Sequence, residues 1–176
     1  MRLRRSSNEV LIWADIMRKF LILSLLFASA IALGQTISAT SKKPNAALMS
    51  KVFSLWLAGD TAALSPYYDH APTDTFFSLL PLQYQGWDEY KNAPQRQFTM
   101  FRSFEGHLNS DATVLVSGAT AWGTATWKGF GRLANGNGAE LEGRWTVIWQ
   151  KKDGRWLIVH DHFSVPWTVP DERRAR

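Results

Sequence analysis

The spacing of apolar residues changes once along this chain, near residue 105, and this change restricts the possible folds. Before it, apolar residues recur at helical intervals, as Leu48, Val52 and Leu55 with Trp56 do. After it, the interval is two, and the segments are rich in threonine and tryptophan, which is typical of strands. A helical first part followed by consecutive strands predicts an α+β domain with helices on one face of a curved antiparallel sheet.

Stop and turn signals divide these segments into predicted elements. A first helix begins at Ala46 and ends at Gly59, and Pro66 breaks a short second helix over residues 61–68. A long helix is expected from Gly86 to about Phe104, with Pro94 as a point of kinking. Strands are expected at residues 75–79, 82–85, 107–116, 120–130, 140–150 and 155–165, with a hairpin turn at residues 152–154.

The first 34 residues have the pattern of a secretory signal. The basic stretch Met17-Arg18-Lys19 precedes the apolar run from Phe20 to Leu33, which is shorter than the roughly 20 residues of a spanning helix. We therefore expect residues 1–34 to be a signal peptide region, with cleavage after Ala32, Gly34 or Ala39, a periplasmic or secreted protein, and no stable membrane span afterwards. An uncleaved anchor is the alternative, and Met17 is an alternative start of translation. Residues 35–45 are then a linker, 46–167 the domain, and 168–176 a charged tail.

Charge and cysteine content exclude several function classes. The chain of 176 residues has 20 basic and 15 acidic residues, but residues 1–34 hold five of the basic and two of the acidic ones. The remainder is nearly neutral and has no basic stripe, so nucleic acid is not an expected partner. Because there is no cysteine, disulfides, thiolate metal sites and thiol nucleophiles are excluded. No phosphate loop or metal-binding motif is present, so neither a cofactor nor a metal is expected.

The closing part of the sequence resembles a known family. Residues 144–149 (RWTVIW), 152–156 (KDGRW) and 158–166 (IVHDHFSVP) are similar to the last hairpin of SnoaL-like proteins in the NTF2-like superfamily. Residues 68–69 (YD), 76–77 (FF), 81–84 (PLQY) and 86–90 (GWDEY) extend the similarity upstream. The pattern from Trp149 to His162 also resembles the association domain of calcium/calmodulin-dependent protein kinase II.

This resemblance implies a fold and a pocket, and it carries over no complete catalytic motif. The implied NTF2-like fold is a cone. Its curved antiparallel sheet wraps around a long helix, two N-terminal helices pack beside them, and a pocket remains at the open end of the cone. Many relatives form homodimers through the outer face of the sheet. Because the superfamily contains isomerases, cyclases, dehydratases, transport factors and assembly domains, the fold alone does not identify an activity.

Three residues are the candidates for acid/base chemistry. His160 and His162 lie two apart on a predicted strand, so both point to one face, which Trp156 and Ile158 should share. Paired imidazoles can move protons, although hydrogen bonding within the sheet face is the structural alternative. Asp69 follows a tyrosine at a position matching the family, in a loop where a pocket mouth would form, and a solvated loop is its alternative.

The candidates for ligand contact are mainly aromatic. The chain has 9 tryptophans, more than a core of this size needs, and tryptophan favours half-buried positions such as pocket walls and interfaces. Trp122 and Trp145 are predicted to share the pocket wall, with packing in the core and sheet as the alternative. Arg144 could hold an anionic group, with a surface charge pair as the alternative. The full set of ligand-binding candidates is Tyr68, Trp87, Trp122, Arg144 and Trp145.

Two functions are compatible with these observations. In the first, an exported domain binds a small, largely apolar molecule in its cone, with or without isomerase-like or lyase-like turnover. In the second, the domain is a non-catalytic homodimeric module that acts through its sheet face. The sequence does not decide whether the protein is an enzyme.

Overall fold

The computed structural model describes residues 40–99 and 101–166, with the side chain of Phe98 excepted. The predicted signal peptide, the linker up to residue 39 and the charged tail lie outside the described residues. The described residues belong to one compact unit. Within the described part, no helix has the length and apolar character needed to cross a membrane.

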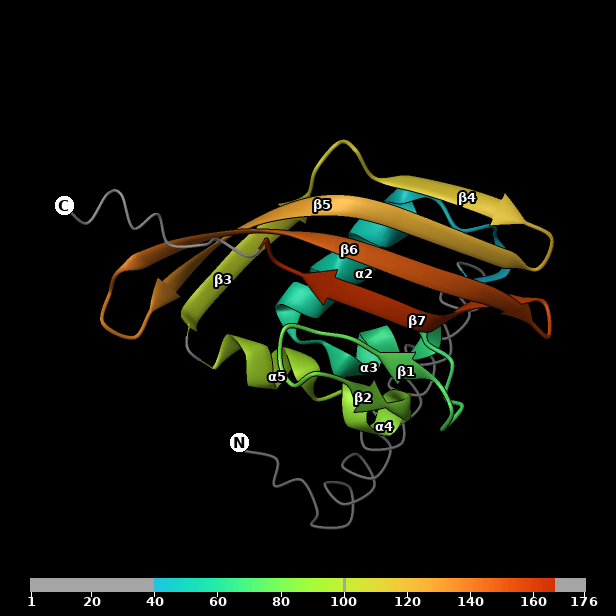
Figure 1. Ribbon diagram of the computed structural model, residues 1–176, viewed down its shortest axis with the longest axis horizontal. Helices are drawn as coiled ribbons and strands as arrows, with labels where there is room; N and C mark the ends of the chain where they lie inside the picture. Colours follow the sequence, from blue (N-terminus) through green and yellow to red (C-terminus); the bar gives the residue numbers. More distant parts are fainter. Residues whose placement is uncertain (1–39, 100, 167–176) are drawn as a thin grey trace, which may run out of the picture. The chain divides into compact units, whose positions relative to one another are not determined.

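The first described long helix, α2 (Ala46–Ala58), agrees with the sequence prediction. The Asn45 side chain accepts a hydrogen bond from the Leu48 amide at 2.9 Å, and Gly59 ends the helix with a φ of 64°. The buried side of α2 faces the large sheet (Figure 1). Its buried residues are Met49, Val52, Phe53 and Trp56, whereas Leu48 and Leu55 are only half-buried.

The large sheet has five antiparallel strands and curves over α2 (Figure 1). The strands are β3 (Phe101–Leu108), β4 (Thr113–Ser117), β5 (Thr120–Leu133), β6 (Gly138–Lys152) and β7 (Arg155–Ser164). The order is β3-β5-β6-β7, and β4 pairs with the other half of β5. The hairpin turn between β6 and β7 has positive φ at Asp153 and Gly154, as a two-residue turn requires. The α+β prediction is therefore confirmed.

Six short elements make up the rest of the described unit. They are α3 (Thr61–Leu64), the 3₁₀ turn η1 (Ser65–Tyr67), β1 (Thr75–Phe76), β2 (Tyr84–Gln85), α4 (Gly86–Tyr90) and α5 (Ala93–Phe98). The predicted strands at 75–79 and 82–85 do pair, but over two residues each. After β1 the chain runs beside β7, where the Phe77 amide donates to the Asp161 carbonyl at 2.9 Å.

The prediction of one helix from Gly86 to Phe104 is wrong. The segment forms α4 and α5, separated by Lys91 and Asn92, and β3 begins already at Phe101. Pro94 lies in the first turn of α5, where its missing N–H is tolerated, so it opens a new helix. The pairing of β3 with β5 is irregular between Phe101 and Ser103, so Phe101 and Phe104 reach one face although they are three residues apart.

A bulge in β7 also changes one predicted face. Ile148 pairs with His160, and the next residue of β6, Trp149, pairs with Ile158, so Val159 is an extra residue in β7. Trp156 and Ile158 are buried, whereas His160 and His162 turn to the other face. The expectation that these two pairs share a face is therefore wrong, because the extra residue reverses the alternation.

Candidate ligand-binding site

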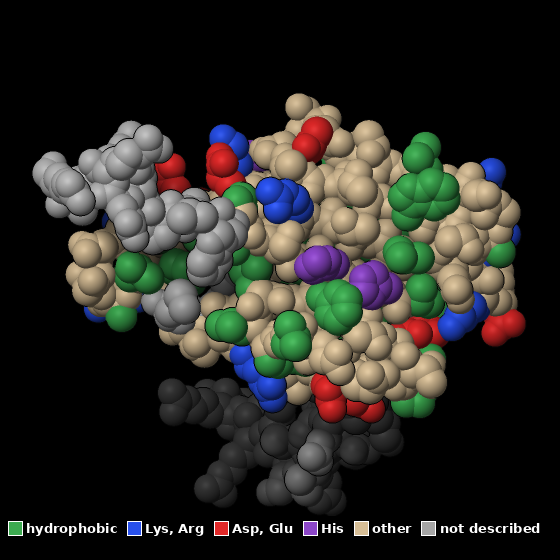
Figure 2. Space-filling model, in the orientation of Figure 1, with side chains coloured by type: hydrophobic (Ala, Val, Ile, Leu, Met, Phe, Trp, Pro, Cys, Tyr) green, Lys and Arg blue, Asp and Glu red, His purple; other side chains and the backbone are tan. Residues whose placement is uncertain are grey.

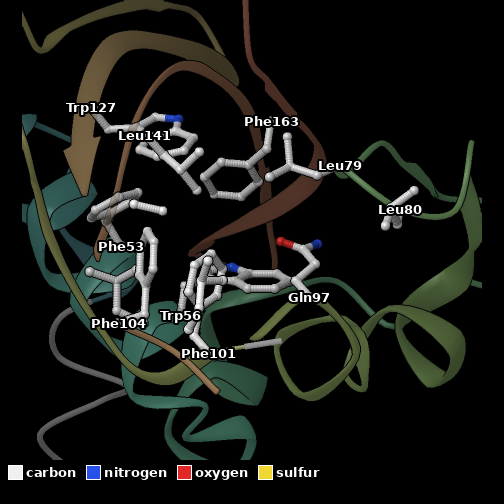
Figure 3. Close-up of a pocket in the computed structure, with 13 residues that line it drawn as sticks. Phe53, Trp56, Leu79, Leu80, Gln97, Phe101, Phe104, Trp127, Leu141 and Phe163 are labelled. Carbon is white, nitrogen blue, oxygen red and sulfur yellow. The ribbon is translucent and has the colours of Figure 1, made fainter. Parts of the chain in front are cut away.

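A cavity of about 260 Å³ lies between α2, α5 and the face of the large sheet that faces α2, here called the inner face. Figure 3 shows aromatic and aliphatic side chains from separate elements converging on this space. The lining residues are Phe53, Trp56, Leu57, Leu79, Leu80, Gln97, Phe101, Phe104, Trp127, Leu133, Ala139, Leu141 and Phe163. The cavity is therefore a product of tertiary packing and not of any single motif.

Glycines in the sheet make room for the rings that form the cavity wall. A Cβ atom at Gly143 would overlap the Trp127 ring and the Ser164 carbonyl oxygen. A Cβ atom at Gly131 would overlap the ring of Phe101. Without these side chains, the two aromatic rings can lie against the sheet, and their positions shape the cavity.

The cavity has almost no polar character. No ionisable side chain is among the residues that line it, and Gln97 supplies the one side-chain amide. The Gln97 Nε2 atom donates a hydrogen bond to the Ser78 hydroxyl, and the amide lies at one side of the cavity (Figure 3). Transfer of a charged group from water into such surroundings is strongly unfavourable, so the site suits an uncharged, mainly apolar molecule.

A second layer of aromatic rings supports the cavity wall. The ring of Phe163 stacks on Trp145 with centroids 5.2 Å apart and an interplanar angle of 5°. Phe53 contacts Phe163, Trp127 and Trp145 at centroid distances of 6.1 to 6.2 Å. Trp145 itself has no exposed surface, so it supports the wall from behind. Dense packing of this kind holds the wall in one arrangement.

A buried carboxyl group lies next to this aromatic layer. Asp161 is fully buried on the inner face of β7, where the Tyr68 hydroxyl donates to its Oδ2 atom at 2.7 Å. The Tyr90 hydroxyl donates to the Oδ1 atom, and the Trp56 Nε1 atom donates to the Tyr68 hydroxyl at 2.7 Å. Burial raises the pKa of Asp161 to about 7, against the hydrogen bonds from the two tyrosines, which lower it.

Sequence reasoning did not single out Asp161 as a functional candidate. Asp161 and Phe163 lie two apart on the last strand, and both side chains are buried on its inner face. The sequence alone does not show which face of this strand is the inner one, because the bulge at Val159 reverses the alternation. The apolar Phe163, two residues after the acid, was the available signal.

The structure places the predicted acid/base residues away from the cavity lining. His160 and His162 lie on the outer face of the sheet, the face turned away from α2, and both contact Phe77 edge-on at 5.2 and 5.5 Å. The Nδ1 atom of His160 lies 2.6 Å from the Thr75 carbonyl oxygen, to which it can donate. Figure 2 shows histidine and hydrophobic side chains next to one another on the surface. Their catalytic role stays a prediction.

Asp69 lies in a separate cluster with Lys152 and Asp74. It forms an ion pair with the Lys152 ammonium group. Burial alone would raise the pKa of Asp69, but the hydrogen bond and charge of Lys152 hold it below its ordinary value. Burial and the neighbouring charge of Asp69 raise the pKa of Asp74 to about 6. Neither acid lines the cavity, and the role predicted for Asp69 also stays a prediction.

The five ligand-binding candidates do not form one site, although two of them, Tyr68 and Trp87, are in contact. Trp145 is buried behind Phe163, whereas Trp122 is 41% exposed on the outer face, so these two side chains cannot share one wall. Arg144 is exposed on the outer face of β6. Tyr68 belongs to the Asp161 network, and Trp87 stacks on its ring at 4.7 Å.

The described residues contain no group of three histidine, aspartate or glutamate side chains arranged to hold a metal ion.

Similarity to known proteins agrees with this architecture. The SnoaL-like domain family matches residues 46–168. An NTF2-like superfamily protein from Salmonella enterica serovar Typhimurium is 18% identical with a TM-score of 0.61, covering 72% of this chain and 94% of its own. A proposed dehydratase of the NTF2-like family from Streptomyces avermitilis is 18% identical with a TM-score of 0.57, covering 69% and 94%.

A proposed calcium/calmodulin-dependent protein kinase II association domain from Xanthomonas campestris is 22% identical with a TM-score of 0.57, covering 70% of this chain and 86% of its own. At these identities the likeness shows the fold alone. None of the curated proteins matches the chain significantly. The resemblance expected from the closing hairpin is confirmed over nearly all of the described residues. The chain has the NTF2-like fold and belongs to the SnoaL-like domain family.

Proposed function

We propose that this protein is exported and binds a small, uncharged and mainly apolar molecule in the cavity between α2 and the sheet. The observation that supports binding is the lining itself, since twelve of its thirteen side chains are apolar and none is ionisable. Export is supported by the basic and apolar segments before Gln35. N-terminal sequencing of the protein from the envelope and cytoplasmic fractions of its host tests export, and a protein found only in the cytoplasm with residues 1–34 intact would contradict it.

The cavity volume and the single amide define the class of ligand. A dry cavity of roughly 150 Å³ accepts a benzene molecule, so about 260 Å³ accommodates a larger ring system or a short branched chain. Gln97 can form one hydrogen bond with a hydroxyl or carbonyl group at the edge of such a molecule. The proposed ligand therefore has an apolar body and one uncharged polar group.

Binding is proposed here without turnover. Acid/base catalysis needs a titratable group within hydrogen-bond reach of the reacting atom. The residues that line the cavity include no such group. A protein of the same fold is described as a proposed dehydratase, but at 18% identity its activity cannot be assigned to this protein.

A cavity-filling variant tests this function. Leu141 lies on the cavity wall, and its neighbour Glu140 is exposed on the outer face of the same strand. We expect Leu141→Trp to weaken binding of the neutral fluorescent probe N-phenyl-1-naphthylamine by roughly tenfold or more, because the larger side chain occupies the site. Glu140→Trp is the matched control and should bind as wild type does. Equal probe affinity in wild type and Leu141→Trp would overturn the proposal.

A second candidate function is association of two copies through the outer face of the sheet. Leu115 pairs with Trp122, and their side chains are 58% and 41% exposed, with Ile148 next to them on β6. Side-by-side exposed apolar side chains are common at interfaces between proteins. The kinase association domains of the same fold add support from similarity alone.

A further inference from the structure

A chain of hydrogen bonds connects the buried carboxyl of Asp161 to the wall of the cavity. Trp56 lines the cavity with its ring, and its Nε1 atom donates to the Tyr68 hydroxyl at 2.7 Å. The Tyr68 hydroxyl in turn donates to Asp161 Oδ2 at 2.7 Å. The Tyr90 hydroxyl donates to the other oxygen of Asp161, and among the described residues no hydrogen bond joins it to the cavity wall, although its ring packs on Trp56 with centroids 4.8 Å apart.

We propose that Asp161 and Tyr68 are positioning residues for the cavity, which hold the Trp56 indole in place so that ligand binding and proton binding at Asp161 are linked. This inference rests on the proposed function, because it concerns how the same cavity is shaped. Neither Asp161 nor Tyr68 lines the cavity, so both act through Trp56.

The Trp56 indole has one polar atom, and the network fixes its direction. The three side chains of this hydrogen-bonded series, Trp56, Tyr68 and Asp161, are each at most 3% exposed, so bulk water cannot replace a lost hydrogen bond. Rotation of the indole would leave its N–H unpaired in the interior, which is costly. The ring also contacts Phe163, another wall residue, with centroids 5.6 Å apart. A change at the hydroxyl of Tyr68 therefore alters the cavity surface.

Protonation of Asp161 must disturb one branch of the network. An ionised carboxyl accepts from both tyrosines, but a protonated one carries its own donor on one oxygen. If that oxygen is Oδ2, the Tyr68 hydroxyl would face two donors, the new O–H and the Trp56 N–H, and its own proton would lose its acceptor. Protonation at Oδ2 therefore couples the orientation of Trp56 to the proton at Asp161, whereas protonation at Oδ1 would disturb the branch to Tyr90.

The titratable side chains around Asp161 are tyrosines, and two of them belong to the same hydrogen-bond network. The titratable groups that face it are Tyr68, in the segment after η1, and Tyr90 on α4, while Tyr84 of β2 acts on Tyr90. Burial, followed by the charge of Asp161, raises the pKa of both Tyr68 and Tyr90, so they remain protonated donors near neutral pH. The histidines of β7 lie on the opposite face of the sheet.

Two matched variants separate positioning from simple loss of a hydrogen bond. Tyr68→Phe and Tyr90→Phe each remove one hydroxyl that donates to Asp161, but only Tyr68→Phe cuts the link to Trp56. The dissociation constant of N-phenyl-1-naphthylamine is measured for both from about pH 5.5 to about pH 8.5. We expect wild type and Tyr90→Phe both to show a pH-dependent affinity, with the inflection of Tyr90→Phe at higher pH, because this variant loses one hydrogen bond that lowers the pKa of Asp161. Tyr68→Phe should lose the inflection and differ in affinity by about fivefold or more.

A measurement without ligand keeps this inference separate from the proposed function. The Nε1–H resonance of Trp56, assigned with a Trp56→Phe variant, should shift with pH in the wild-type protein and not in Asp161→Asn. Probe binding with identical pH profiles for both tyrosine variants would overturn the positioning roles and leave the cavity function standing. An indole resonance that does not respond to pH would overturn them whatever the probe does. Absence of probe binding with a responsive indole would overturn the proposed function and its linkage to Asp161.

Discussion

At the scale of single residues, Asp161 should make the protein less stable as pH rises. Its pKa is about 7 in the folded protein and near its ordinary value of 3.8 after unfolding, so the folded state keeps the proton longer. This contribution is complete below about pH 4 and is lost as pH rises to about 7. The upper limit of the loss is about 4 kcal/mol, because each pKa step corresponds to about 1.4 kcal/mol.

Urea unfolding of wild type and Asp161→Asn between about pH 4 and about pH 8 measures this effect. The decrease in unfolding free energy should be strongly reduced in Asp161→Asn. Asp74→Asn is the control, since Asp74 also has a raised pKa but is only partly buried, and most of the decrease should persist there. An unchanged pH slope in Asp161→Asn would contradict the assignment.

The residue scale is also where prediction from sequence is least complete. His160 and His162 were correctly assigned to one face, because a spacing of two survives wherever a strand is regular. The face shared with Trp156 and Ile158 was wrong, since one extra residue at Val159 reverses the alternation. A buried aspartate such as Asp161 is hard to predict, because acids are seldom buried without partners that only the folded chain supplies.

At the scale of elements, the close approach of β6 to its neighbours depends on Gly143. Gly143→Ala should lower the unfolding free energy by about 1 to 3 kcal/mol, because the added methyl group overlaps the Trp127 ring and the Ser164 carbonyl. It should also weaken probe binding, since Trp127 lines the cavity. Urea unfolding and a probe titration measure the two effects. Arg144→Ala, one residue away and exposed, should change neither, and equal behaviour of the two variants would argue against this packing.

Helix and strand prediction succeeded where local signals and tertiary structure agree. The helix from Ala46 has its cap, its apolar spacing and its terminal glycine in the sequence, and it forms as predicted. The helix expected up to Phe104 failed for two reasons. Pro94 starts a separate helix, and the irregular pairing near Arg102 gives Phe101 and Phe104 the three-residue spacing of a helix inside a strand. Spacing alone cannot distinguish a helix from a bulged strand.

At the scale of the whole unit, the layers could be predicted and the cavity could not. The order of elements and the hairpin turn were sufficient for an α+β arrangement and for the family resemblance. The cavity combines α2, α5 and four strands, together with Leu79 and Leu80 after β1. Its lining follows from which residues each bulge turns inward, so it can be described only after the register of the sheet is known.

The outer face of the sheet yields a prediction about the assembly. If two copies associate there, wild type should have the mass of a dimer at micromolar concentration, and Trp122→Glu should be a folded monomer. The reason is that a charge would replace an exposed apolar side chain next to Leu115 without disturbing the core. Ala62→Glu introduces the same charge at an exposed position on α3 and should remain dimeric. Light scattering coupled to gel filtration measures the mass. A monomeric wild type would remove association from the candidate functions, whereas a Trp122→Glu dimer would move the interface elsewhere and leave the outer face without a role in assembly.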